Sequence, residues 1–127
     1  MGTVFYLARD DNHTLFDLGK SYSWARALRE HERVPVDQAA LAKTLRGTYD
    51  GGEDSYIAEV VRRIVTFADG HELRLVEDQW FWDHTPERDA FRTERGELRV
   101  IDSRFPGDWK AAGTMPLWQF WEANLDD

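Results

Sequence analysis

Two pairs of polar residues have the chemistry of a metal or acid–base site: His71-Glu72 and Asp83-His84. Imidazole nitrogens and carboxylate oxygens together bind zinc, manganese or iron. Asp83 could also orient His84 as a general base, although adjacent strand residues point to opposite faces and would need a bend to pair. The two pairs meet only if the strand-like segments that carry them form a hairpin. Their spacing matches no metal-binding motif, so polar residues at strand ends are the simpler interpretation.

Motifs for other kinds of catalysis are absent from the sequence. The chain has no cysteine, which excludes a disulfide, a thiolate metal site and a cysteine nucleophile. It has neither the Gly-x-Ser-x-Gly sequence of a serine nucleophile nor a Gly-x-Gly-x-x-Gly or Walker sequence for nucleotide phosphate. Gly51-Gly52 precedes a predicted helix, but Glu53 and Asp54 stand where an anion would bind. We therefore expect no cofactor, and an enzyme is the less favoured interpretation.

Negative charge is concentrated in the second half of the chain. The formal net charge is −8. Residues 1–63 carry 9 basic and 10 acidic groups, whereas residues 64–127 carry 7 basic and 14 acidic groups. An acidic surface disfavours nucleic-acid phosphate and anionic membrane, and it attracts basic proteins. The simpler alternative is that the acidity only keeps the protein soluble.

The tryptophans divide into core candidates and one binding candidate. Trp24, Trp118 and Trp121 fall on apolar helical stripes and are expected in the core. Segment 79–83 is predicted to be a strand with Trp80 and Trp82 on one face and Phe81 on the other, so both of its faces are aromatic. Either both faces are covered by other elements, or one of them is an aromatic binding surface. The predicted binding residues lie on and around this strand: Trp80, Trp82, Glu72, Glu77, Asp78 and Asp83.

Helical periodicity organises the middle of the chain. Residues 55–68 carry apolar side chains three and four apart, which predicts the central core helix, and Asp69-Gly70 ends it. On its opposite side, Arg62-Arg63 beside Glu59 indicates a solvated face rather than a nucleic-acid contact. Further helices are expected over 21–32, after the N-cap Asp37, and from Met115-Pro116 onward.

Alternating segments surround the helices. A hairpin is predicted between 3–8 and 14–18. Strands over 71–77 and 79–83, with a hairpin of 90–94 and 97–102, would make a four-strand meander. The predicted fold is thus one α+β domain over residues 1–127. Its antiparallel sheet combines the N-terminal hairpin and the C-terminal meander, and it packs against three to four helices.

The composition and the fold class together give the functional expectation. No apolar run suits a membrane span or a signal peptide, so a cytoplasmic protein is expected. Arg outnumbers Lys 13 to 3, which is typical of a GC-rich genome, and we expect a bacterial source. The leading hypothesis is a small protein-binding module without catalysis, such as an immunity-type inhibitor of a basic toxin. One alternative is a metal-dependent or small-molecule-binding enzyme domain using His71, Glu72, Asp83 and His84. The other is a structural subunit that forms a homodimer through a sheet edge or the Trp surface.

Overall fold

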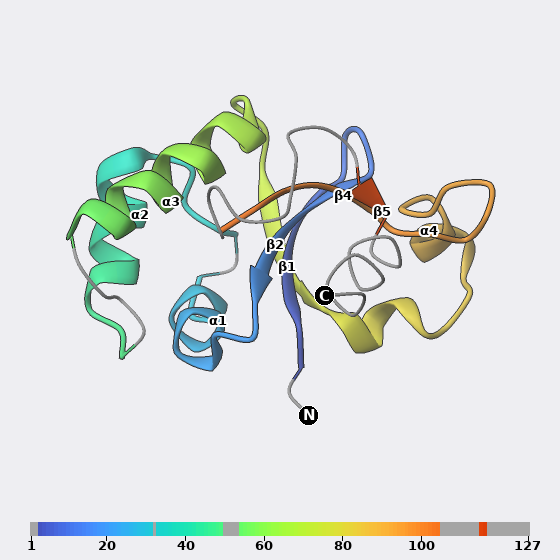
Figure 1. The fold of residues 1–127 in the computed structure, drawn as a ribbon, viewed down its shortest axis with the longest axis horizontal. Helices are drawn as coiled ribbons and strands as arrows, with labels where there is room; N and C mark the ends of the chain where they lie inside the picture. Colours follow the sequence, from blue (N-terminus) through green and yellow to red (C-terminus); the bar gives the residue numbers. More distant parts are fainter. Residues whose placement is uncertain (1–2, 32, 50–53, 105–114, 117–127) are drawn as a thin grey trace, which may run out of the picture.

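A mixed β-sheet lies between a layer of three helices and a second layer of short helical turns (Figure 1). The computed structural model describes residues 3–31, 33–49, 54–104 and 115–116. The strands are β1 (Phe5–Arg9), β2 (Thr14–Gly19), β3 (Leu73–Glu77), β4 (Arg99–Ser103) and the two-residue β5 (Met115–Pro116). The helices are α1 (Tyr22–Arg29), α2 (Gln38–Arg46), α3 (Asp54–Ala68) and α4 (Pro86–Asp89), with the 3₁₀ helix η1 (Asp78–Phe81). The α+β class is confirmed.

Local signals placed the first half of the fold correctly. The β1–β2 hairpin and the three long helices form where they were predicted, although α1 ends at Arg29. The Asp37 carboxylate accepts a hydrogen bond of 2.9 Å from the Ala40 N–H and caps α2. Helix α3 ends where Asp69 and Gly70 take φ values of 48° and 79°. This left-handed turn directs the chain back into β3.

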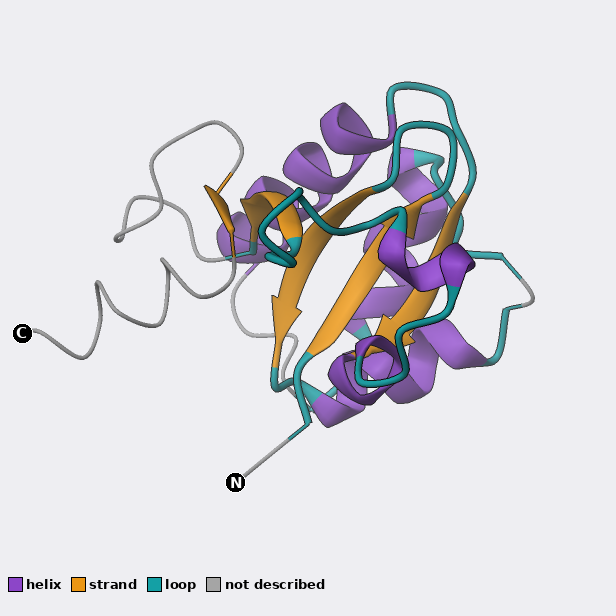
Figure 2. Cartoon of the chain, turned by 90° about the vertical axis from the view of Figure 1, so that its right-hand side faces the viewer, coloured by secondary structure: helices purple, strands orange, loops and turns teal. Residues whose placement is uncertain are grey.

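The order of the strands corrects the predicted antiparallel sheet. Within the described residues the order is β3-β1-β2-β4-β5, so the first hairpin forms the middle of the sheet. Strand β3 pairs antiparallel with β1, whereas β4 pairs parallel with β2, and Leu15 lies opposite Val100. The predicted meander is wrong because the chain between β3 and β4 crosses one face of the sheet. Strand β4 then joins the sheet beside β2 and not beside β3. Figure 2 looks onto that face.

Segment 79–83 is not a strand. It lies mostly in η1, and α4 begins soon afterward at Pro86. The Asp78 N–H donates to the Val4 carbonyl (2.9 Å), and the next turn buries Phe81 beneath the sheet while Trp82 points outward. A 3₁₀ turn has three residues per turn, so it separates neighbouring aromatics much as a strand would. The Trp-Phe-Trp pattern therefore suits both structures.

Two further predictions need correction or fall outside the described residues. The hairpin of 90–94 and 97–102 is reduced to one bridge, Arg92 to Leu98, across a turn in which Gly96 has a φ of 82°. The terminal helix was expected from Met115, but Met115–Pro116 is strand β5. Residues 117–127, with Trp118 and Trp121, lie outside the described part of the chain.

The core has one apolar cluster on each face of the sheet. Phe5 and Leu7 point to the helix layer, where Trp24 is fully buried as predicted. Tyr6 and Ala8 point to the opposite face, which η1 and the segment after α4 cover. Strand β1 is therefore buried on both faces, which explains its nearly continuous apolar sequence. None of the helices in the described residues has the length and apolar character to cross a membrane.

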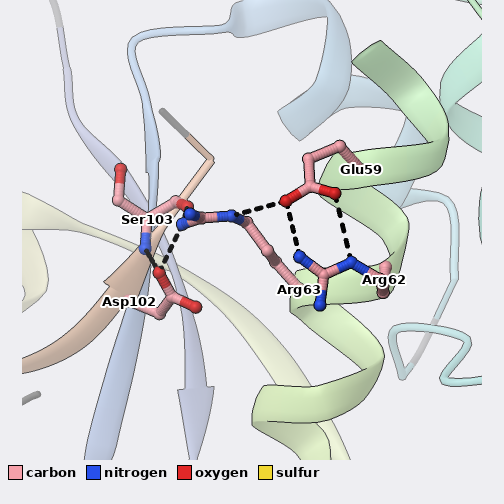
Figure 3. Close-up of polar contacts among 5 residues, drawn as sticks. All are labelled: Glu59, Arg62, Arg63, Asp102 and Ser103. Atoms are coloured by element: carbon pink, nitrogen blue, oxygen red, sulfur yellow. Dashed lines mark hydrogen bonds and ion pairs between the residues drawn. The ribbon is translucent and has the colours of Figure 1, made fainter. Parts of the chain in front are cut away.

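Arg63 ties the central helix to the sheet (Figure 3). Its guanidinium donates to Asp102 Oδ1 (2.7 Å), to the Ser103 carbonyl (2.9 Å) and to Glu59 Oε1 (3.3 Å). Arg62 bonds only Glu59 among the described residues and is 58% exposed. The predicted solvated face thus holds for Arg62, while Arg63 connects α3 to β4.

Candidate functional site

Trp82 is an exposed aromatic side chain in an acidic setting. It follows η1 and is 76% exposed. The neighbouring Asp83 and Glu87 side chains are 80% and 77% exposed. We call Trp82, Asp83 and Glu87 the Trp82 surface. It combines a large apolar side chain with two carboxylates that remain accessible to a partner.

Trp80 differs from Trp82 because it is packed into the structure. Its ring makes edge contacts with Phe81 (4.8 Å between centroids) and Phe91 (5.4 Å). The guanidinium carbons of Arg74 and Arg88 lie 4.6 and 5.3 Å from the ring centroid. Cations stacked on an indole are attracted to its π-face and hold its orientation. Trp80 is therefore held in place, whereas the Trp82 side chain is exposed.

The two arginines on Trp80 are themselves held by carboxylates. Arg74 Nε donates to Asp10 Oδ2 (2.8 Å), and Arg88 Nη1 donates to Asp83 Oδ2 (2.9 Å). Sequence reasoning missed both arginines. The Asp10 contact depends on the pairing of β3 with β1, which no local pattern indicated. The five-residue spacing of Asp83 and Arg88 is a usable signal only when a turn and a helix start are already known.

A groove of about 780 Å³ lies along the outer side of β3. The end of α1, with Leu28 and Arg29, forms one wall. Trp80 and Arg88 contribute the opposite wall, and Leu75 and Glu77 of β3 line the floor. Its volume is in the range of ligand-binding clefts, about 300–1,000 Å³. The groove and the Trp82 surface adjoin, because Asp83 belongs to both.

The structure brings some predicted binding residues together and separates others. Trp80, Glu77 and Asp83 line the groove, and Trp82 adjoins Asp83. Glu72 directly precedes β3, at the opposite end of the strand from Glu77, and forms an ion pair with Arg33. Asp78 lies near the buried Tyr6. Burial above all, together with the Asp17 and Asp78 carboxylates, raises the pKa of the Tyr6 phenol above its ordinary value.

The metal candidates do not meet as predicted. Because 79–83 forms no hairpin with β3, His71 and His84 lie beyond opposite ends of β3 and η1. His71 Nε2 approaches Asp11 Oδ2 (3.5 Å) beside the β1–β2 turn, and His84 Nδ1 approaches Asp89 Oδ1 (3.3 Å). Among the described residues, no three His, Asp or Glu side chains are grouped as a metal site would need. The premise of the metal alternative, a shared hairpin end, is wrong.

The comparisons with known proteins give no relative. No family model matches the chain, and the searches of curated proteins and of solved structures found no match. The function is therefore argued from the geometry of the groove and the Trp82 surface.

Proposed function

We propose that this chain is a protein-binding module without catalysis that docks a basic partner protein on the Trp82 surface. The observation that carries the proposal is the 76% exposure of Trp82. Tryptophan is among the residues most enriched at the energetic centres of protein interfaces. An immunity-type inhibitor of a basic toxin is one concrete form of this function.

Trp82 can supply a large share of the binding free energy. Covering about 100–150 Å² of its ring would contribute about 2.5–4 kcal/mol at about 25 cal/mol per Å². The side chain stands at the end of η1, whose Phe81 is buried and whose Trp80 is held by stacked arginines. A rigid support reduces the conformational entropy lost on binding. This part of the chain therefore suits an anchor.

The surrounding charge supports a basic partner. Residues 77–89 contain the acidic side chains Glu77, Asp78, Asp83, Glu87 and Asp89, against the single arginine Arg88. Rim carboxylates mainly raise the association rate, whereas a buried aromatic anchor mainly slows dissociation. The two kinds of residue should therefore affect different rate constants.

The test uses a partner captured from an extract of the native host and measured by surface plasmon resonance. Trp82→Ala should speed dissociation by about 30-fold, which corresponds to about 2 kcal/mol at an interface hot spot. Tyr49→Ala is the matched control, because Tyr49 is 97% exposed and follows α2 closely in the chain. Helix α2 lies on the opposite side of the sheet from α4 (Figure 1). Tyr49→Ala should leave both rates unchanged.

Charge reversal separates the rim from the anchor. Glu87→Lys should slow association and flatten its dependence on salt, with little effect on dissociation. Glu87 suits this test because its nearest described cation, Arg74 Nη2, is 3.9 Å away and the side chain is 77% exposed. Unchanged binding by both Trp82→Ala and Glu87→Lys, each shown to be folded by circular dichroism, would move the docking site elsewhere.

A further inference from the structure

Strand β3 is an edge of the sheet with open main-chain groups. Its inner side pairs with β1, with Tyr6 opposite Val76 and Leu7 opposite Leu75. On its outer side, the Val34 N–H donates to the Leu73 carbonyl (3.1 Å). Leu73 therefore directs its hydrogen-bonding groups outward. Because these directions alternate along an antiparallel strand, Leu75 and Glu77 also direct their N–H and C=O groups outward.

The inner contacts support this assignment. The Asp78 N–H donates inward to the Val4 carbonyl (2.9 Å), as alternation from Leu73 requires. Beyond the Val34 bridge, no described residue pairs with the outer side of β3. The Leu75 N–H and C=O and the Glu77 N–H thus lie open along one stretch, in the geometry that β-strand addition uses. The Glu77 carbonyl is not open, because Glu77 is the N-cap of η1 and its carbonyl accepts the first hydrogen bond of that helix.

The groove gives this open stretch the shape of a slot. The end of α1 rises on one side of β3, and Trp80 rises on the other. An added strand would lie about 4.8 Å from β3, with its side chains pointing alternately toward the two walls. One set would face Leu28 and the other would face the Trp80 ring. The walls therefore offer apolar contacts on both faces of the incoming strand.

We propose that the basic partner contributes an extended segment that pairs with β3 at Leu75 and Glu77, so that the sheet of this protein continues into the partner. The proposal rests on the proposed function and specifies how that partner binds. The Glu77 carboxylate makes no ion pair within the described residues, so it receives a basic side chain of the segment. An apolar side chain of the segment packs on Trp80.

Charge favours this occupant over a second copy of the chain. Each copy has a net charge of −8, so two copies repel each other, whereas a basic partner is attracted. The groove itself is lined by Arg29, Arg74 and Arg88 as well as by Glu77 and Asp83, and Asp83 already pairs with Arg88. Within the groove, the basic side chain of the segment is therefore placed at Glu77.

The test isolates main-chain pairing at Glu77. The probe is the tightest binder from a phage-displayed library of random decapeptides, selected on the full chain. Glu77→Pro removes the outward N–H, and proline is tolerated at a strand edge where that N–H faces solvent. Glu77 has φ −117°, whereas proline fixes φ near −65°, so Glu77→Pro turns the backbone by roughly 50° at this residue. Peptide affinities are therefore compared only if the Arg74 and Val76 amides of Glu77→Pro stay protected by their pairing with β1; otherwise the exchange measurement on the unmodified protein decides. Glu77→Ala is the matched control, since it removes the carboxylate and keeps the N–H.

Glu77→Pro should weaken peptide binding about tenfold more than Glu77→Ala, as the loss of one main-chain hydrogen bond predicts. Amide hydrogen exchange gives a second measurement on the unmodified protein. At saturating peptide the Leu75 and Glu77 amides should become protected. The Arg74 and Val76 amides, which pair with β1, should show no such change.

The outcomes separate this inference from the proposed function. Equal affinity of the two Glu77 variants, unchanged exchange at Leu75 and Glu77, or a selection without binders would overturn strand addition. Loss of partner binding in Trp82→Ala would then leave the proposed function standing. Protection of both amides with a partner that ignores Trp82→Ala would support the edge and refute docking on the Trp82 surface.

Discussion

The contact between Arg63 and strand β4 gives the sharpest test of the fold. Arg63 Nη1 lies 2.7 Å from Asp102 Oδ1 and 2.9 Å from the Ser103 carbonyl, and its side chain is 22% exposed. Arg63→Met keeps the apolar stem and removes both bonds to β4, together with the weaker contact with Glu59. Hydrogen bonds to charged groups contribute about 1.5–3 kcal/mol, and partial exposure reduces that, so we expect a loss of about 1–3 kcal/mol.

Urea unfolding followed by circular dichroism measures this loss. With a urea dependence of about 1.5–2 kcal/mol per molar, the midpoint should fall by about 0.5–2 M. Arg62→Met is the control, because it removes the same side chain from the same helix but breaks only the contact with Glu59. It should leave the midpoint nearly unchanged. A double-mutant cycle with Asp102→Ala should give a coupling free energy of about 0.5–3 kcal/mol. Equal shifts for the two arginine variants, or full additivity in the cycle, would refute the tether.

Three further predictions concern the core, pH and metal. Ile64 is fully buried, so Ile64→Ala should lower the free energy of unfolding by about 2–5 kcal/mol, and a midpoint unchanged in urea would contradict the assignment of α3 to the core. The buried Tyr6 hydroxyl has no hydrogen-bond partner within the described part of the chain, so Tyr6→Phe should leave stability at pH 7 unchanged or higher. Because folding raises the pKa of Tyr6, its contribution is complete below the ordinary value of 10.0 and is lost as pH rises above it. Alkaline unfolding should therefore be less steep in Tyr6→Phe, and identical profiles would exclude Tyr6 as the cause. Zinc should leave the melting temperature unchanged, and a rise that His84→Ala abolishes would restore the metal alternative.

The sequence predicted the elements whose signals are local. Asp37 caps α2 through its own side chain, and Asp69-Gly70 ends α3 through its own dihedral angles. The pairing of Leu15 with Val100 has no such signal, because parallel strands are joined by a long crossover rather than a turn. The strand predicted over 79–83 was wrong for a different reason. The aromatic pattern of this segment suits a strand and a 3₁₀ turn equally, and burial of Phe81 decided between them.

The candidate site was predicted in part. The sequence singled out Trp80 and Trp82, but only the structure shows that arginines hold the first and leave the second exposed. Glu77 was predicted as a rim charge, whereas its main chain lies on an open sheet edge. An edge depends on the order of all strands, so residues 73–77 could not reveal it by themselves.

The parallel pairing of β2 with β4 also has a consequence during synthesis on the ribosome. About 80 residues separate the end of β2 from the start of β4, so translation at about 5–20 residues per second leaves roughly 4–16 s between them. During that interval β1 can cover one side of β2, while its other side has no strand beside it. Leu15, Phe16 and Leu18 are fully buried in the finished protein. The nascent chain therefore exposes an unpaired, aggregation-prone apolar strand edge until β4 emerges. Chaperone binding would protect the chain during this interval.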